Sequence, residues 1–152
     1  MNNGSSKERE MTQTFRIHPV GVVRKASRET WIEVFPEYEK ALLGLDDFSH
    51  AMVVFWFHKN DNPRERSTLR VHPRRDPKKP LTGVFATRSP ARPNLIGIST
   101  CRVLGVEGNV VRIERIDADH DTPVVDIKPW IPAEDLVEDV VLPPWANVSK
   151  GD

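Results

Sequence analysis

The segment 83–97 gathers the side chains of this chain that are best suited to binding an anion or a polar cofactor. An apolar run from Val84 to Ala86 leads into a loop that carries Arg88, Arg92 and several hydroxyl and amide groups. Two prolines fix φ in this loop and favour extended backbone, so it is not helical and loses little entropy on ordering. Because guanidinium groups match planar pairs of oxygen atoms, the segment predicts a binding loop. The alternative is a stiff connection between strands whose arginines are solvated.

His58 and Lys59 form a second candidate, directly after the apolar run 51–57. A histidine at the end of a strand can stack on an adenine, hydrogen-bond to it, or accept a proton near neutral pH. The alternative is that His58 is only a polar residue that ends a strand.

The segment 117–123 contains three aspartates and a histidine, a composition that suggests a metal site. However, the calcium-binding loop with its terminal glutamate is absent, and no second cluster has the spacing of zinc ligands. We therefore expect no metal in this protein.

The charge is distributed unevenly, although the net charge is zero. Residues 63–92 hold nine Lys or Arg against two acidic residues, whereas residues 107–152 hold four against eleven. A basic loop beside a cofactor site would position the phosphates of a nucleic acid. The candidate RNA contacts are Arg74, Arg75, Lys78, Lys79 and Arg92. The alternative is a solvated loop that is balanced by an acidic surface.

The pattern of apolar residues indicates mainly β-structure. We expect strands at residues 15–24, 31–35, 51–57, 98–106, 110–116 and 124–128. The run 51–57 is unbroken, so it is predicted to be a central strand buried on both faces. Residues 107–109 predict a hairpin turn, residues 37–43 before Gly44 predict a helix, and residues 131–136 predict a single helical turn.

Roughly seven short strands with one or two short helices favour a small closed or nearly closed β-barrel. Parallel βαβ units need helical crossovers, for which the chain has too few candidates. No glycine-rich phosphate loop follows a strand and opens a helix, which argues against a Rossmann-type domain.

Length and composition fit one compact domain. A chain of 152 residues can bury about 70% of its extended surface, and the single cysteine excludes an internal disulfide. We expect a disordered leader at residues 1–13, a domain at residues 14–142 and a tail at residues 143–152. The leader lacks an apolar core and no apolar run reaches the length of a membrane span, so we expect a cytoplasmic protein.

Four blocks of sequence, in order, resemble the TsaA/TrmO-like family. They are Gly21–Arg24, then Leu45–His50 with Phe57 and His58, then the Phe-Ala-Thr-Arg-Ser motif continued by Arg92-Pro93-Asn94, and finally Asp121–Pro129. Together they span roughly residues 15–132. We expect the short form of the family, without its extra C-terminal domain.

The resemblance implies a β-barrel methyltransferase that binds S-adenosylmethionine. Characterised members of the family methylate N6 of the threonylcarbamoyl-adenosine beside the tRNA anticodon. It also implies a homodimer with the pocket near the subunit boundary. The alternatives are a cofactor- or RNA-binding module of the same fold, and a methyltransferase for a small molecule or a protein.

The resemblance also assigns roles to residues. It implies cofactor contacts at His58, Lys59, Arg88, Ile98, Asp117, Ala118, His120, Thr122 and Pro123. Because N6 of the modified adenosine must lose a proton, we expect a general base, with Asp126 and His58 as the candidates. Apolar neighbours predict that Asp126 is buried, which would raise its pKa. The alternative is that Asp126 pairs with Lys128 or Arg88 and only shapes the pocket.

Four departures from the family pattern affect the expected pocket. Leu95 replaces the third proline of the central motif, and Trp130 stands where a tyrosine is common. The glycine that usually precedes the threonine of the last block is missing before Thr122. Longer members of the family also carry an insert between the first strand and the helix, where this chain has only the short connection of residues 25–30.

Overall fold

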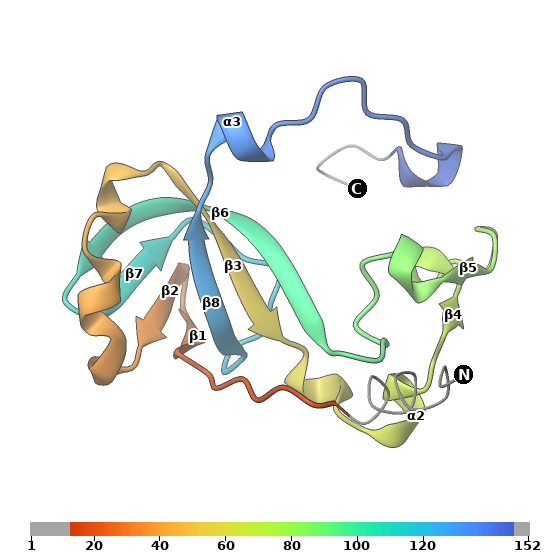
Figure 1. Cartoon of the computed structure of the whole chain (residues 1–152), viewed down its shortest axis with the longest axis horizontal. Coiled ribbons are helices and arrows are strands. Elements are labelled where there is room, and N and C mark those ends of the chain that lie inside the picture. The colour runs from red at the N-terminus through yellow and green to blue at the C-terminus, as the bar shows by residue number, and fades with distance from the viewer. Residues whose placement is uncertain (1–12, 148–152) are drawn as a thin grey trace, which may run out of the picture.

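The computed structural model describes residues 13–147, and its centre is a closed β-barrel (Figure 1). The barrel strands follow the order β1-β2-β7-β6-β3-β8, and all neighbouring strands are antiparallel. Their bounds are β1 Gly21–Ala26, β2 Glu29–Val34, β3 His50–Trp56, β6 Ile96–Glu107, β7 Val110–Ile113 and β8 Pro123–Pro129. The predicted fold class, a small closed barrel with short helices, is confirmed.

Between β3 and β6 the chain leaves the barrel and builds a small lobe, residues 58–95, beside one end of it (Figure 1). The lobe consists of η3 His58–Asn60, α2 Pro63–Arg66, β4 Arg70–Val71, η4 Pro73–Arg75, β5 Thr82–Gly83 and η5 Val84–Ala86. Strands β4 and β5 pair with each other in a separate two-stranded sheet. The predicted binding loop and the basic stretch therefore both lie in this lobe.

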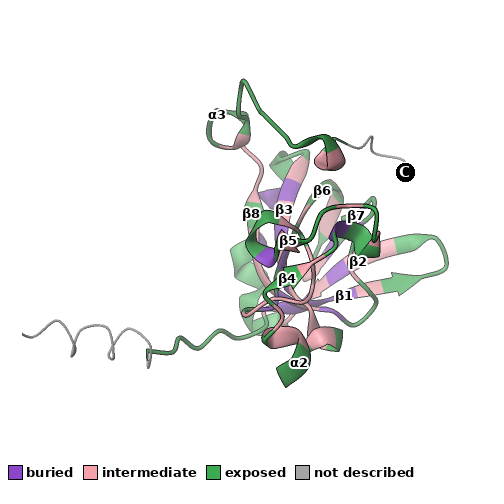
Figure 2. Cartoon of the chain, turned by 90° about the vertical axis from the view of Figure 1, so that its right-hand side faces the viewer, coloured by how far each residue is buried: buried purple, intermediate pink, exposed green. Residues whose placement is uncertain are grey.

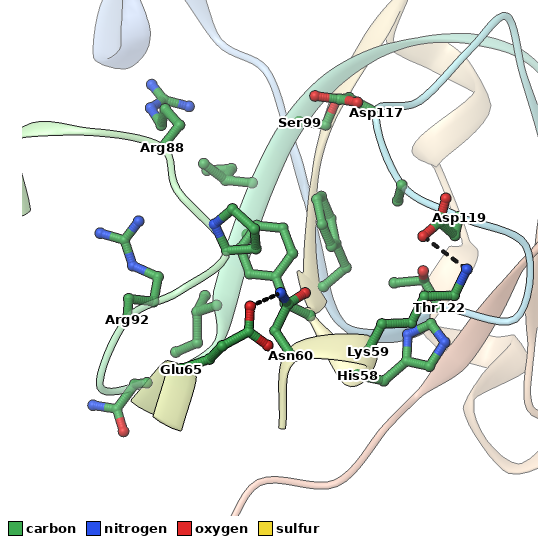
Figure 3. Close-up of a pocket in the computed structure, with 18 of the residues that line it drawn as sticks. His58, Lys59, Asn60, Glu65, Arg88, Arg92, Ser99, Asp117, Asp119 and Thr122 are labelled. Atoms are coloured by element: carbon green, nitrogen blue, oxygen red, sulfur yellow. Dashed lines mark hydrogen bonds and ion pairs between the residues drawn. The ribbon is translucent and has the colours of Figure 1, made fainter. Parts of the chain in front are cut away.

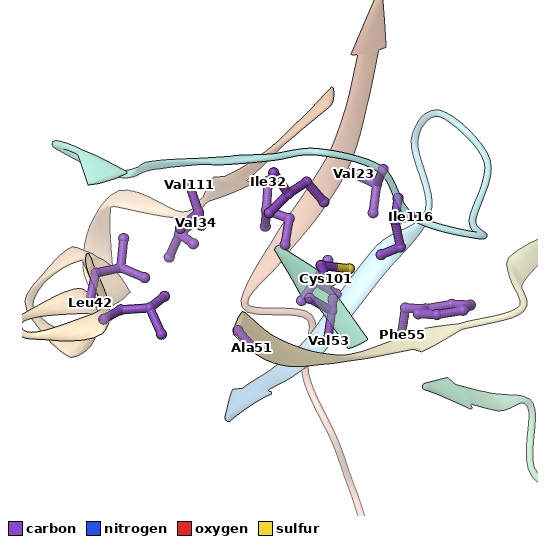
Figure 4. Close-up of a cluster of buried hydrophobic side chains, with 13 residues drawn as sticks. Val23, Ile32, Val34, Leu42, Ala51, Val53, Phe55, Cys101, Val111 and Ile116 are labelled. Carbon is purple, nitrogen blue, oxygen red and sulfur yellow. The ribbon is translucent and has the colours of Figure 1, made fainter. Parts of the chain in front are cut away.

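The hydrophobic core fills the interior of the barrel (Figures 2 and 4). On β3, Ala51, Val53 and Phe55 are buried, and the residues between them are only half-buried. The prediction that this run is buried on both faces is therefore wrong. Because successive side chains of a strand point to opposite faces, a barrel strand presents only one face to the core. Further core residues are Val23, Ile32, Val34, Leu42, Leu45, Cys101, Val111, Ile113, Ile116 and Val124.

Two glycines stand at positions of the barrel where another residue would strain the backbone. Gly108 has φ +59° in the turn between β6 and β7, where the predicted hairpin is confirmed. Gly21 begins β1 beside β2, and a Cβ atom there would lie only 2.6 Å from the carbonyl oxygen of Glu33. A side chain at this position would thus push the first two strands apart.

Some predicted elements differ from those observed. Residues 37–43 contribute to the 3-10 helix η1 (Pro36–Leu42) in place of an α-helix, and Leu42 is its one buried residue. Helices in proteins are stabilised mainly by packing of an apolar face. A single buried side chain does not give this segment such a face. The predicted strand 15–24 begins only at Gly21. The predicted helical turn is confirmed as α3 (Pro132–Asp135), and η2 (Leu45–Asp47) and η6 (Pro144–Ala146) complete the structure.

The predicted terminal segments fall largely outside the described residues. The leader is described only at residue 13, and the tail only to residue 147. Within residues 13–147, no helix is long and apolar enough to cross a membrane.

Candidate cofactor and RNA site

A large open pocket lies where the lobe meets one end of the barrel (Figure 3). Its volume is about 1300 Å³. Its lining comes from the end of β3, the start of β6, the lobe, and the turn that precedes β8. Segments that are far apart in the sequence therefore meet at one site.

The floor of the pocket is aromatic and apolar. Phe55 and Phe57 pack edge to face, with their ring centroids 5.3 Å apart. Gly97 on β6 lies against both rings, because a Cβ atom there would be 2.5 Å from Phe55 and 2.7 Å from Phe57. Ile98 follows on the same strand and also lines the pocket. Such a floor suits a planar heteroaromatic ring.

The loop 87–94 forms one wall, and Arg92 holds its shape. The Arg92 guanidinium donates hydrogen bonds to the carbonyl oxygens of Val84, Thr87 and Ser89, at 3.1, 3.3 and 3.0 Å. Arg88 lies on the same side of the pocket in Figure 3, and its side chain has no partner among the described residues. Arg88 is thus available to an anionic ligand, whereas Arg92 is largely engaged by the loop.

The turn 117–122 forms the opposite wall (Figure 3). Asp119 pairs with Lys59 Nζ at 3.1 Å, and the buried Thr122 donates its amide N–H to the Asp119 carbonyl at 3.2 Å. Within residues 13–147, the backbone N–H groups of Ala118 and Asp119 donate to no protein acceptor. These two donors are available to the polar edge of a ligand.

Asp121 stands in this turn at the position where the family pattern has a glycine. Asp121 has φ +69°, a left-handed conformation that glycine prefers and aspartate tolerates. Its carboxylate accepts a hydrogen bond from Arg24, and His120 Nε2 lies 3.3 Å from it. The hydrogen bond to Glu33, followed by that to Asp121, raises the pKa of Arg24. His120 Nδ1 accepts the amide N–H of Lys25 at 2.9 Å, so side chains anchor the turn to β1.

Most of the predicted cofactor contacts come together in this pocket. Its lining includes His58, Lys59, Arg88, Ile98, Asp117, Ala118 and Thr122. His120 lies within the turn and Pro123 directly follows it, but neither residue lines the pocket. Of the predicted RNA contacts, Arg75 and Arg92 line it, while Arg74, Lys78 and Lys79 lie outside the lining.

Asp126 lies on β8 and is not among the lining residues. It pairs with Val54 on the outer face of the barrel, whereas the next residue, Ile127, packs against the core. Its side chain is 49% exposed and lies 3.1 Å from Lys128 Nζ. The burial predicted for Asp126 is therefore wrong, because its apolar neighbour faces the other side of the strand.

Several lining residues had no predicted site role. The aromatic Phe55, Phe57 and Phe85 are among them, as are Asn60 and Glu65, whose side chains hydrogen-bond at 2.8 Å. The phenylalanines resemble core residues in the sequence. The one indication of these ring contacts in the sequence was Gly97, because a glycine inside a strand often marks the close approach of another group.

In the part of the chain that the structure describes, no three His, Cys, Asp or Glu side chains converge in a way that could hold a metal ion.

The site thus combines, at one end of a closed antiparallel barrel, an aromatic floor, an arginine and two backbone amides that have no partner within residues 13–147. These features suit a ligand with a planar ring and polar groups. The chain belongs to the tRNA-methyltransferase O N-terminal domain family, TrmO_N, whose model matches residues 12–136. The family predicted from four sequence blocks is thereby confirmed.

Relatives and solved structures agree with this assignment. A Methanocaldococcus jannaschii protein, named a probable S-adenosyl-L-methionine-binding protein, is 44% identical over 114 residues, which is 75% of this chain and 90% of that protein. The human tRNA (adenine(37)-N6)-methyltransferase is 42% identical over 110 residues, which is 72% of this chain and 24% of that protein. TrmO from Pseudomonas aeruginosa has a TM-score of 0.68 and 29% identity, covering 88% of this chain and 62% of that one. The chain thus spans less than two thirds of the TrmO structure and about a quarter of the human enzyme.

Proposed function

We propose that this protein is an S-adenosylmethionine-dependent methyltransferase that modifies N6 of adenine 37 in tRNA. The names of its relatives support both the cofactor and the acceptor. The observation that carries the proposal is the convergence of Arg88, the aromatic floor and two backbone amides in one pocket beside a basic lobe. Among residues 13–147 these two amides have no acceptor.

The donor set fits S-adenosylmethionine part by part. Arg88 can bind the cofactor carboxylate through its planar fork. The floor around Phe57 and Ile98 can pack against adenine, while the amides of Ala118 and Asp119 can pair with its polar edge. The Asp117 carboxylate can accept hydrogen bonds from the ribose hydroxyls or the ammonium group.

The pocket also has room for more than the cofactor. Its volume of about 1300 Å³ exceeds the roughly 300–1,000 Å³ that is typical of a pocket for one small ligand. The additional space supports entry of the acceptor nucleotide beside the cofactor.

When bound, the cofactor supplies an electrophilic methyl group on a positively charged sulfur atom. An N6 that bears a carbonyl substituent is a weak nucleophile, so its proton must be taken up as the new bond forms. His58 lines the pocket and can accept this proton at an imidazole nitrogen. Asp126 is the second candidate, although its carboxylate faces outward beside Lys128. The walls of the pocket would align the reacting atoms.

Two variants separate the candidate bases. If His58 is the base, His58→Gln lowers single-turnover methylation by about 10²–10⁴-fold, and Asp126→Asn lowers it only a few-fold. Cofactor affinity is measured on both variants as the control. A large loss of turnover in Asp126→Asn alone would move the base to that residue.

The basic part of the lobe is proposed to hold RNA phosphates. Arg74 and Arg75 adopt φ values of +55° and +57°, a left-handed conformation that costs non-glycine residues free energy and is common at functional sites. Lys78 and Lys79 follow on the same loop. Neutralising all four should weaken tRNA binding and flatten its salt dependence while cofactor affinity is retained. Unchanged tRNA affinity would favour a small-molecule acceptor.

We also propose a homodimer that acts in the cytoplasm, where tRNA is available. The arm 136–142, which follows α3, carries exposed apolar side chains and is mostly green in Figure 2. They are Leu136, Val137, Val140, Val141 and Leu142. A second copy could cover this arm, because exposed apolar patches mark interfaces. Light scattering should give about twice the monomer mass of 17.3 kDa. A monomer at micromolar concentration would contradict the dimer.

Calorimetry tests the cofactor site directly. The wild-type protein should bind S-adenosylmethionine, and Arg88→Ala should weaken binding by about 1.5–3 kcal/mol, the range for hydrogen bonds to charged groups. Arg28→Ala is the matched control, because this exposed arginine lies outside the pocket. No binding by the wild type at millimolar cofactor would contradict the proposed function.

A further inference from the structure

We propose that Phe85 is a stacking platform for a base of the tRNA anticodon loop. This inference rests on the proposed function, because it assigns a contact to the acceptor of the same site. It concerns a residue for which neither the binding motif nor the charge pattern predicted a role.

The exposure of Phe85 sets it apart from the other aromatic residues of the pocket. Its exposed fraction is 83%, although it lines the pocket, whereas Phe55 is only 3% exposed in the floor. The preceding residue, Val84, is 2% exposed. The short helix η5 thus buries its first side chain and presents the next one to solvent at the pocket.

Hydrogen bonds to both the amide and the carbonyl group of Val84 fix the backbone just before Phe85. The Val84 amide donates to the carbonyl oxygen of Leu69 at 2.9 Å. The Val84 carbonyl oxygen accepts three hydrogen bonds: from the Thr87 amide at 3.1 Å, from Thr87 Oγ1 at 2.9 Å and from Arg92 at 3.1 Å. The backbone that carries the Phe85 ring is therefore ordered before any ligand arrives. Stacking of a ligand then costs mainly the rotamer freedom of one side chain.

The charge around the ring selects the type of ligand. Arg75 and Arg88 line the same pocket as Phe85, so an exposed ring and two cationic side chains face one open space. Aromatic rings combined with positive charge are the features that bind unpaired bases and their phosphates. An anticodon loop presents unpaired bases, which proteins recognise by stacking.

The floor of the pocket and the exposed Phe85 ring are therefore assigned to different ligands. Phe55 and Phe57 are fixed by Gly97 inside the pocket, where the cofactor adenine fits. Phe85 lines the same pocket but is exposed to solvent, where it can contact an incoming nucleotide. Loss of its ring should accordingly affect RNA binding and leave cofactor binding unchanged.

The test compares four variants of the full-length protein. Its probe is an anticodon stem-loop that carries threonylcarbamoyl-adenosine. Phe85→Ala should weaken stem-loop binding by about 5- to 150-fold, the range for a base stacked on an aromatic ring. Phe85→Trp should bind within a few-fold of the wild type, while Phe85→Leu, which is apolar but cannot stack, should bind like Phe85→Ala. Phe15→Ala is the matched control, because Phe15 is 82% exposed and does not line this pocket.

Two further readouts separate stacking from a structural effect. Cofactor affinity by calorimetry should remain within two-fold in every variant, and the salt dependence of stem-loop binding should keep its slope because no charge is removed. Wild-type stem-loop affinity in Phe85→Ala would overturn the inference. A parallel loss of cofactor affinity would reassign the ring to the cofactor, and a change in molecular mass by light scattering would reassign it to a subunit interface. If the wild type binds the cofactor but neither binds nor methylates the stem-loop, the proposed acceptor fails, and the stacking role fails with it.

Discussion

The substitution Gly97→Ala tests the construction of the pocket floor. A Cβ atom at this position would lie 2.5 Å from Phe55 Cε2, and 2.7 Å from Cζ of both Phe55 and Phe57. Because carbon atoms prefer separations of about 3.5–4.0 Å, both rings would have to retreat by roughly 1 Å. Phe55 is 3% exposed, so its ring has little free space to enter.

The expected cost follows from this overlap. Added volume in a packed core typically destabilises a protein by about 1–3 kcal/mol. At about 2–4 °C per kcal/mol for a protein of this size, the melting temperature should fall by about 2–12 °C. Displacing the floor by about 1 Å also misplaces the bound cofactor, which can lower turnover about 100-fold.

Gly105→Ala is the matched control on the same strand, β6. Its Cβ atom would meet only the Arg112 side chain, at 3.3 Å from Nη2 and 4.0 Å from Nε, and this flexible side chain can move away. Thermal unfolding and cofactor calorimetry should therefore leave Gly105→Ala close to the wild type while Gly97→Ala is impaired in both. If the two variants unfold at the same temperature and bind the cofactor equally, the described contact between Gly97 and the floor rings is wrong.

Three further predictions follow from single residues. Asp121→Gly should change the free energy of unfolding by less than about 1 kcal/mol, while Asp121→Val should destabilise by about 1–3 kcal/mol because its φ is +69°; urea unfolding measures both. Burial raises the pKa of the Cys101 thiol, so a thiol-specific disulfide reagent should react slowly with the folded protein near neutral pH and rapidly after denaturation; equal rates would show that the thiol is accessible. The hydrogen bond from Arg66 lowers the pKa of Asp61 below its usual 3.8, so the stability due to this pair is present at neutral pH and lost as pH falls through the lowered pKa. Asp61→Asn should therefore reduce stability at neutral pH and weaken its dependence on acid, and an unchanged acid unfolding curve would contradict the pairing.

The local signals in the sequence predicted the barrel well where they involved turns. Residues 107–109 offered Gly108 for a positive φ, and the hairpin formed there. The prediction that the run 51–57 is buried on both faces was wrong because apolar residues occupy both faces of β3. A continuous apolar run lacks the alternation of apolar and polar residues that marks a strand with one buried face. Its outer side chains are half-buried and not part of the core.

The candidate site was predictable where its residues carried chemistry of their own. His58, Arg88 and the turn 117–122 were identified from side-chain type, and the structure brings them into one pocket. Phe85 was not, because exposure of an aromatic ring depends on the fold around it. The orientation of Asp126 depends on the register between β3 and β8, which the composition of its own strand does not determine.

Methyl transfer to tRNA is the most direct test of the proposed function. Purified protein and S-adenosylmethionine with a labelled methyl group are incubated with tRNA that carries threonylcarbamoyl-adenosine, and the nucleosides are analysed by mass spectrometry. The structure and the family predict that the label appears on N6 of adenine 37, and that Arg88→Ala reduces it while Arg28→Ala does not. Cofactor binding without any labelled nucleoside would contradict the methyltransferase and leave a cofactor-binding protein of the same fold.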